Sequence, residues 1–386
     1  GLAHFAEHMA FNGTKNFAKH ELIDYLETIG MRFGADLNAY TSFDETVYML
    51  TVPTDSVEFV AKAFQILEDW AHHVSMESEE VDKERGVVIE EWRRRRGARQ
   101  RMQDKQLPIL LKGSRYAERL PIGVKAVLDT FRHETLRDFY TRWYRPDLMG
   151  FVAVGDFDPQ SIEDKIEKHF SRLQPPENPS ERIVYPVPDH KETLVSIVTD
   201  PEATGNTVRI YYKADVREQQ TVGAYRESLV ESIYHSMFNQ RLQELTKLSE
   251  PPFLVGSSRQ GQLLRSKEAF LLAAAVLDNG FDVGLEALLT EASRVRQHGF
   301  TQSEMRRTKK KMIRRMERIY LERDKSQSDR YASEYTRYLL DQEPTPGIEI
   351  ELKLYQELLP GIELAELNEL AASWTGNENR VILVSA

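Results

Sequence analysis

The first seventeen residues, GLAHFAEHMAFNGTKNF, contain the pattern that most constrains this chain. His4, Glu7 and His8 stand there in the order H-x-x-E-H. On an α-helix with 3.6 residues per turn, side chains four residues apart lie one above the other on the same face, so both imidazoles can bind one metal ion. Glu7 then lies beside the ion, where a carboxylate can take a proton from a water that the metal activates. The pattern predicts a helix that carries part of a metal site.

The same order of residues is the inverted form of a zinc-binding motif found on helices. A motif this short also arises by chance. The alternative is an amphipathic helix whose histidines are hydrated or lie at the edge of a core. A third ligand elsewhere in the chain would favour the metal site.

A candidate for this ligand lies in the segment SEEVDKERGVVIEEWRRRR, residues 78–96, which has the character of a long helix. Glu84 and Glu91 are seven residues apart and fall on one helical face to within about 20°. Two histidines, one carboxylate and a water form a known catalytic zinc set. One glutamate could therefore bind the metal while the other orients a ligand. The alternative for such a pair is two hydrated acids on an exposed face.

Composition limits the classes of function. The net charge of −10 over 386 residues argues against a general nucleic-acid binder, because phosphates would be repelled. No apolar run reaches the ~18 residues of a membrane span. The chain has no cysteine, so a zinc ion must be held by histidine and carboxylate.

Periodicity and turn residues predict the elements along the chain. In the first half, helices are expected at 1–12, 20–29, 54–73, 78–96 and up to Phe170, with strands at 35–41 and 45–52. A segment with five prolines between Leu173 and His190 is expected to be a linker. In the second half, strands are expected at 207–212, 252–260 and 268–276, with helices at 222–245, 280–297 and 302–323.

The second half repeats the order of elements of the first. SEEVDKERGVVIEEW and SEMRRTKKKMIRRME pair at an offset of about 225 residues, which brings the position of Glu91 next to Arg315. No H-x-x-E-H occurs after residue 180. The second copy is therefore predicted to bind no metal.

Taken together, these segments resemble a known family, the M16 metallopeptidases of the insulinase, pitrilysin and mitochondrial processing peptidase group, and most closely its bacterial zinc proteases. The resemblance covers the first 170 residues almost continuously and in family order. The matching segments are GLAHFAEHMAFNGTKNF, GADLNAYTSFDETVY, ERGVVIEEWR, YAERLPIG and FYTRWYRPDLMGFVAVGDFD.

The resemblance implies a role for each residue of the predicted site. His4 and His8 are expected to bind one Zn²⁺ per chain, with Glu7 as the general base. The third zinc ligand of the family falls on Glu91, and Glu84 is the supporting acid.

The resemblance also implies a peptide site. The residues that match the family's substrate strand are Asn38, Ala39, Tyr40 and Thr41. A peptide is expected to add to this strand as a further β-strand. Phe11 and Tyr40 match aromatic positions near the pocket for the residue after the scissile bond; the alternative is that both are ordinary core aromatics.

The expected fold class is α+β, with two homologous domains that each consist of a mainly antiparallel sheet covered by helices. Residues 1–172 are expected to be the zinc-bearing domain, 173–190 the linker and 191–386 the metal-free domain. The chain starts close to the metal helix, without a preceding strand or a signal peptide, and is interpreted as a fragment.

Two functions are compatible with these patterns. The first is a zinc endopeptidase that hydrolyses peptides or unfolded polypeptides, periplasmic by resemblance to the bacterial members. The second is a non-catalytic peptide-binding or assembly subunit. The Arg and Tyr that complete the site in many family members are not evident around Arg241, so a complementary half is the expected partner. No nucleic acid and no membrane span are expected.

Overall fold

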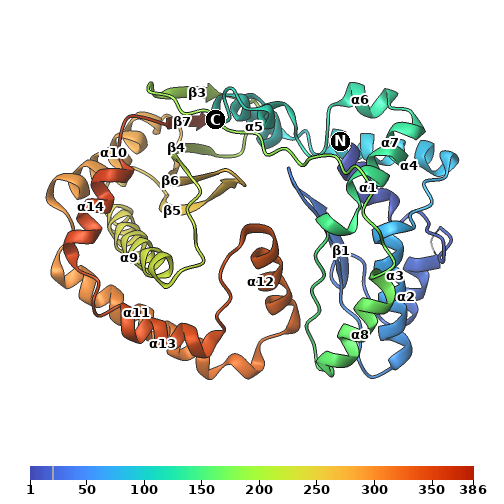
Figure 1. Ribbon diagram of the computed structural model, residues 1–386. Helices are drawn as coiled ribbons and strands as arrows, with labels where there is room; N and C mark the ends of the chain where they lie inside the picture. The colour runs from blue at the N-terminus through green and yellow to red at the C-terminus, as the bar shows by residue number, and fades with distance from the viewer. Residues whose placement is uncertain (20) are drawn as a thin grey trace. The chain divides into compact units, whose positions relative to one another are not determined.

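The computed structural model describes residues 1–19 and 21–386, and within them the chain forms two compact units (Figure 1). The first unit consists of Gly1–Arg95, Arg119–Ile183 and Gln327–Leu340, and the second of Arg96–Glu118, Val184–Ser326 and Asp341–Ala386. A single division along the sequence, such as the one predicted at 173–190, does not separate these segments. Residues 173–190 contain no helix or strand.

The first unit is mainly helical, with one two-stranded hairpin. Its helices are α1 (Leu2–Met9), α2 (Glu21–Thr28), α3 (Val57–His72), α4 (Ser78–Arg94), α6 (Lys125–Thr130), α7 (His133–Trp143), α8 (Pro159–Phe170) and most of α12 (Ser328–Asp341). Its strands are β1 (Leu37–Thr41) and β2 (Thr46–Leu50). The elements predicted for this half are present with small shifts at their ends, although His20, the predicted start of the second helix, lies outside the described residues.

Helix α1 ends at Met9, three residues before the predicted end at residue 12. Phe11 N donates to His8 O and Asn12 N donates to Met9 O, which tightens the chain into turns instead of continuing the helix. The indole Nε1 of Trp70 on α3 donates to Ala10 O at 3.0 Å. The C-terminal end of the metal helix is thus held by α3.

The core of the first unit consists of two clusters, one packed against α1 and one at the C-terminal end of α1. Phe5 and Met9 pack with Val81 and Val88 of α4 in one cluster. Ala10 packs with Trp70 and residues of α2 and α3 in the other. Apolar side chains therefore pack on one face of α1 and at its end, and this packing fixes the direction in which His4 and His8 point.

The second unit is built on a five-stranded sheet. Its strands are β3 (Leu194–Val198), β4 (Asn206–Asp215), β5 (Val255–Leu264), β6 (Lys267–Val276) and β7 (Arg380–Ser385). Its helices are α5 (Ala98–Leu110), α9 (Val222–Leu245), α10 (Phe281–His298), α11 (Gln302–Leu321), α13 (Ile348–Leu358) and α14 (Leu364–Trp374).

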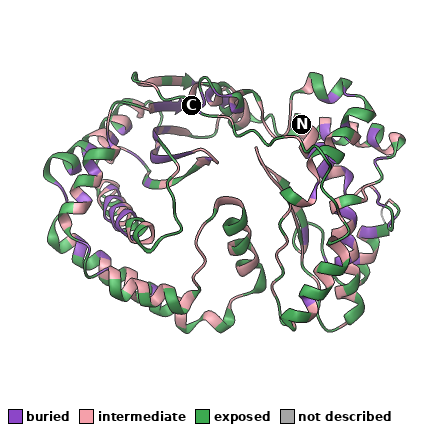
Figure 2. Cartoon of the chain, in the orientation of Figure 1, coloured by how far each residue is buried: buried purple, intermediate pink, exposed green. Residues whose placement is uncertain are grey.

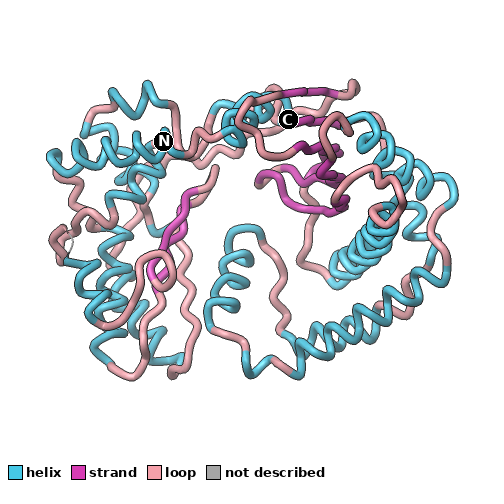
Figure 3. The backbone as a smooth tube through the Cα atoms, turned by 180° about the vertical axis from the view of Figure 1, so that it is seen from behind, coloured by secondary structure: helices cyan, strands magenta, loops and turns pink. Residues whose placement is uncertain are grey.

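The strand order is β3-β7-β4-β6-β5, as labelled in Figure 1, and Figure 3 shows the strands in magenta from behind. Only the β3–β7 pair is parallel; the other neighbours are antiparallel. Helices α9, α10 and α14 cover the sheet, and α9 is buried along much of its length (Figure 2). The predicted fold class, α+β with mainly antiparallel sheets covered by helices, is confirmed.

None of the helices in the described ranges is both long and apolar enough to cross a lipid bilayer.

Candidate metal centre

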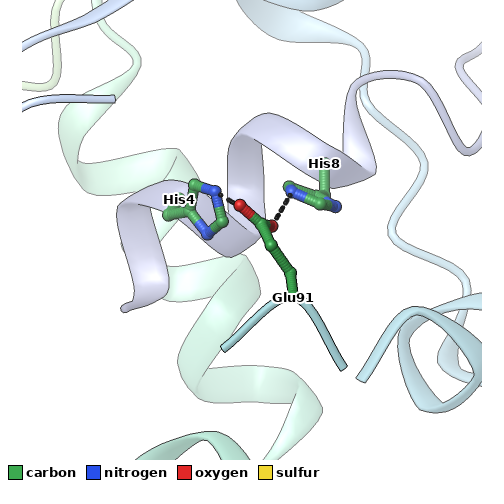
Figure 4. A group of neighbouring side chains, drawn as sticks. All are labelled: His4, His8 and Glu91. Atoms are coloured by element: carbon green, nitrogen blue, oxygen red, sulfur yellow. Dashed lines mark ion pairs between the residues drawn. The ribbon is translucent and has the colours of Figure 1, made fainter. Parts of the chain in front are cut away.

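Two histidines and one glutamate converge between α1 and α4 (Figure 4). His4 and His8 lie on successive turns of α1, and Nε2 of each faces the same carboxylate oxygen, Oε2 of Glu91 on α4. The distances are 3.5 Å from His4 Nε2 and 3.2 Å from His8 Nε2. Among residues 1–19 and 21–386, this is the one group of three or more His, Asp or Glu side chains with metal-site spacing.

The spacing of these atoms fits a zinc ion. In a tetrahedral site with metal–ligand bonds of about 2.0–2.1 Å, neighbouring ligand atoms are about 3.3–3.4 Å apart. The two nitrogen–oxygen distances, 3.2 and 3.5 Å, lie on either side of this value. Two imidazoles and one carboxylate are also the donor set of known catalytic zinc sites.

The packing of α4 explains why its two glutamates reach α1. Val81 and Val88 are seven residues apart and fully buried against α1 and α7. Glu84 and Glu91 follow each valine by three residues, so they lie on the same side of the helix and point toward the histidines. Glu90 is exposed and pairs with Arg93, away from the site.

Glu84 holds the second histidine in place. Its Oε1 lies 2.7 Å from His8 Nδ1, and its Oε2 accepts a hydrogen bond of 2.6 Å from Asn12 Nδ2. A carboxylate on Nδ1 keeps the proton there, which leaves the lone pair of Nε2 for a metal. Asn12 was not predicted as part of the site, although it belongs to the same opening stretch.

Glu91 has a second partner that sequence reasoning missed. Arg95, one turn further along α4, lies 2.5 Å from Glu91 Oε1. This contact holds Oε1 of the Glu91 carboxylate, while Oε2 of the same group faces the histidines. The i, i+4 spacing of Glu91 and Arg95 was a usable signal, since such pairs meet on a helix surface.

The ring nitrogens of the site differ in their affinity for protons. Burial, followed by the nearby His8, lowers the pKa of His4 to about 4. Burial also lowers the pKa of His8, but the hydrogen bonds with Glu84 and Glu91 outweigh it and raise this pKa to about 9. The hydrogen bond from His8 lowers the pKa of Glu91 despite its burial. The metal-free site is thus an ion pair between His8 and Glu91 beside a neutral His4. A metal would have to displace the proton that lies between His8 Nε2 and Glu91.

Glu7 is buried beside this group, with 8% of its surface exposed. Its Oε2 accepts a hydrogen bond of 2.5 Å from Thr41 Oγ1. Burial raises the pKa of the Glu7 carboxyl group, and the Thr41 hydrogen bond only partly offsets this rise. A carboxylate with a raised pKa is a better proton acceptor near neutral pH.

Strand β1, which contains Asn38 to Thr41, pairs along one edge with β2. No other strand in the described part of the chain pairs with it. Asn38 and Tyr40 are exposed on one face, whereas Ala39 and Thr41 are half-buried on the other. An edge strand of this kind can accept a further strand.

Phe11 belongs to an aromatic cluster next to the site. Its ring lies 5.3 Å from Trp70 and 5.7 Å from Phe33, measured between centroids. Phe33 is 56% exposed, so the cluster opens to solvent at this residue. Phe33 lies in a loop without a motif, and nothing in the sequence indicated it.

Two family models match this chain. The model described as insulinase (peptidase family M16) matches residues 1–111, and the model described as the peptidase M16 inactive domain matches residues 130–312.

Two curated relatives are similar over most of the chain. The zinc protease PQQL-like of Arabidopsis thaliana is 38% identical and covers 95% of this chain. The probable zinc protease PqqL of Escherichia coli (strain K12) is 34% identical and covers 79% of it. The matched regions are 36% and 33% of these relatives, so the chain spans about a third of their length.

Solved structures of a protease similar in sequence also have a similar fold. The periplasmic protease PqqL from Escherichia coli superimposes with a TM-score of 0.92 at 30% identity, over 100% of this chain and 43% of that one. A structure of the first half of the same protease gives a TM-score of 0.91 at 30% identity, over 100% of this chain and 82% of that one.

Proposed function

Because the chain belongs to peptidase family M16, the insulinase family, we propose that it is the zinc-binding part of an endopeptidase that hydrolyses peptides or unfolded polypeptides. One observation carries this proposal. Nε2 of His4 and of His8 lie 3.5 and 3.2 Å from Glu91 Oε2, which is the spacing of zinc ligands, and Glu7 lies on the same helix turn as His8. The curated relatives are named zinc proteases, which agrees with this assignment.

One zinc ion per chain would be held by His4, His8 and Glu91. When bound, zinc lowers the pKa of a water molecule and polarises a peptide carbonyl. Glu84 keeps the His8 ring in its binding orientation through Nδ1. Without this partner, the ring could rotate or carry its proton on the other nitrogen.

Glu7 is the proton carrier in this proposal. Its carboxylate takes a proton from the attacking water and later delivers it to the leaving amine. Its burial supports this role, because a raised pKa brings proton affinity closer to that required at neutral pH. The absence of cysteine excludes a thiol nucleophile.

The peptide would bind along the outer edge of β1, at Asn38 to Thr41. Backbone hydrogen bonds there would supply affinity without regard to sequence. Phe11, with the exposed Phe33 beside it, offers an apolar surface for a bulky side chain near the scissile bond. Tyr40 is exposed on the strand and is proposed to contact the peptide.

A complementary M16 half, from the same gene product or a second subunit, is proposed as the partner. The chain spans 36% and 33% of the two curated relatives, which leaves room for such a half in proteins of that length. We propose the periplasm as its location, since the structurally similar protease from Escherichia coli is described as periplasmic.

A second candidate function is a non-catalytic peptide-binding or assembly subunit. The match of residues 130–312 to a domain described as inactive favours it for that part of the chain. The ligand geometry around His4, His8 and Glu91 favours the peptidase.

Zinc analysis and one substitution test the proposal. The purified chain should contain about one equivalent of zinc at neutral pH. Glu7→Gln should keep this zinc and abolish cleavage of an unfolded peptide, assayed with the complementary half present. Less than about half an equivalent of zinc, or unchanged turnover in Glu7→Gln, would contradict the peptidase.

A further inference from the structure

A line of hydroxyl groups runs from the hairpin to Glu7. Thr41 Oγ1 donates to Glu7 Oε2 at 2.5 Å, and Thr46 Oγ1 lies 3.1 Å from Thr41 Oγ1. Thr41 and Thr46 face each other in the register of β1 and β2, at the end of the hairpin where Ser42 N bonds to Glu45 O. The carboxylate is thus held by a side chain of the strand proposed to bind the peptide.

The line continues into the core of the first unit. The hydroxyl of Tyr144 is hydrogen-bonded to Thr46 and lies 2.8 Å from the hydroxyl of Tyr48. The Tyr48 ring stacks on Trp70, which itself bonds to the end of α1 through Ala10. The hydroxyl line therefore ends in rigid, packed aromatic rings.

Counting protons gives the line a direction. A hydroxyl group has one proton to donate, and Thr41 gives its proton to Glu7. Thr46 must then donate its proton to Thr41 across the hairpin. The protons of Thr41 and Thr46 thus both point toward Glu7 Oε2, which is kept as an acceptor.

The other carboxylate oxygen has no such partner. Glu7 Oε1 makes no hydrogen bond within the part of the chain that the structure describes. Since Oε2 is occupied by Thr41, Oε1 is the oxygen available to exchange a proton with a reacting group.

We propose that Thr41 is a positioning residue that couples peptide binding on β1 to the orientation of Glu7. The proposal rests on the proposed function. A peptide that pairs with β1 fixes the backbone of Thr41, and the Thr41 hydroxyl in turn holds Glu7 with Oε1 toward the reaction. Thr46 supports this contact by holding Thr41 from across the hairpin.

The kinetic test removes the hydroxyl group and keeps the shape of the side chain. Thr41→Val should lower kcat by about ten- to a hundredfold, part of the 10²–10⁴-fold that a placed base contributes. The KM for the same unfolded peptide should stay within about twofold, because the backbone of β1 is unchanged. Thr41→Ser should restore most of kcat, and Thr46→Val should give a smaller loss than Thr41→Val.

A matched control comes from the same hairpin. Thr51 follows β2 and is exposed, so Thr51→Val makes the same chemical change outside the hydroxyl line. This variant should retain the wild-type kcat. Zinc content should be equal in all variants. Wild-type kcat in Thr41→Val, or a rise in KM at constant kcat, would overturn the proposal.

A spectroscopic test does not depend on activity. With ¹³C-methyl-labelled threonine in the metal-free chain, the methyl signals of Thr41 and Thr46 should shift in Glu7→Ala and stay in place in Glu84→Ala. Unmoved signals in Glu7→Ala would overturn the coupling itself. If these signals shift but the wild-type protein, assayed with the complementary half present, cleaves no peptide, the contact stands and the proposed peptidase fails.

Discussion

Helix α4 of the first unit and helix α11 of the second occupy corresponding places in the sequence, about 225 residues apart, yet they use these positions differently. On α4, Glu84 and Glu91 both contact His8 and belong to the candidate metal centre. On α11, Lys309 donates to the carbonyl oxygen of Ile362 at 2.5 Å, and Met316 is buried. Corresponding positions thus contact the candidate ligand His8 on α4, whereas on α11 one bonds to a backbone oxygen and the other packs in the interior.

The two units also differ in the buried charged groups that they contain. In the second unit, Arg241 makes two hydrogen bonds to Glu304, at 2.7 and 3.0 Å, and one to Glu291 at 3.2 Å. In the first unit, buried His4 Nδ1 has no hydrogen-bond partner among the described residues. Buried polar atoms without a partner in the described part of the chain also occur in the second unit, for example Tyr234 Oη and His235 Nε2, so the two units differ in the kind of buried charge cluster and not in whether every buried polar group is satisfied.

The largest expected effect is a loss of zinc affinity when Glu91 of α4 is replaced. Glu91→Gln should weaken zinc binding by more than about 100-fold, because it removes a direct ligand. Glu84→Gln should weaken it by about 10–100-fold, as is typical for groups that orient a ligand. Competition with a chromophoric chelator measures both. Glu90→Gln, a change of the exposed neighbour, is the control, and equal losses in all three variants would contradict the assignment.

The complementary change in the second unit should affect stability and leave zinc binding unchanged. Arg241→Met leaves Glu304 without its cation and Glu291 with only the exposed Arg294, which costs about 3 kcal/mol or more. Arg294 also pairs with Glu291, at 3.0 Å, but its side chain is 57% exposed. Arg294→Met should therefore cost less than about 1 kcal/mol. Denaturant unfolding measures the loss of unfolding free energy in each variant. Similar losses in the two variants would contradict the expected difference between the buried and the exposed ion pair.

A smaller effect should depend on pH and originate in the second unit. His235 is buried against Trp374 and bonds to Ser258 Oγ at 2.7 Å, and burial lowers its pKa to about 4. Between pH 6.5 and 4 the unfolded chain binds a proton that the folded chain does not, so stability falls as pH falls through this range. The loss at pH 5 should be about 2 kcal/mol.

Replacing the histidine should flatten this dependence. His235→Gln should reduce the change in unfolding free energy between pH 7 and pH 5, whereas the same substitution at the exposed His298 should not. An unchanged pH dependence in His235→Gln would show that other groups are responsible.

The sequence predicted what depends on local periodicity. The spacing of His4, His8, Glu84 and Glu91 placed these residues on two helical faces, and the structure brings those faces together. Strands β1 and β2 were predicted from their alternation and the polar turn between them. These patterns are read within a few residues, so one chain is enough to detect them.

Features that depend on long-range contacts could not be predicted. Strand β7 lies between β3 and β4, and its Leu383 pairs with Arg209, far away in the sequence. The contact between Thr41 and Glu7 joins two elements that only the packed core brings together. Phe33 lies beside the candidate site because its exposed ring contacts Phe11, and no residue pattern encodes that contact.

Zinc-edge anomalous diffraction from crystals of the zinc-loaded chain tests the central claim most directly. The account predicts a single strong peak bounded by His4 Nε2, His8 Nε2 and Glu91, with bonds of about 2.0–2.2 Å. A peak elsewhere, for example in the second unit, or no peak beside α1, would contradict it.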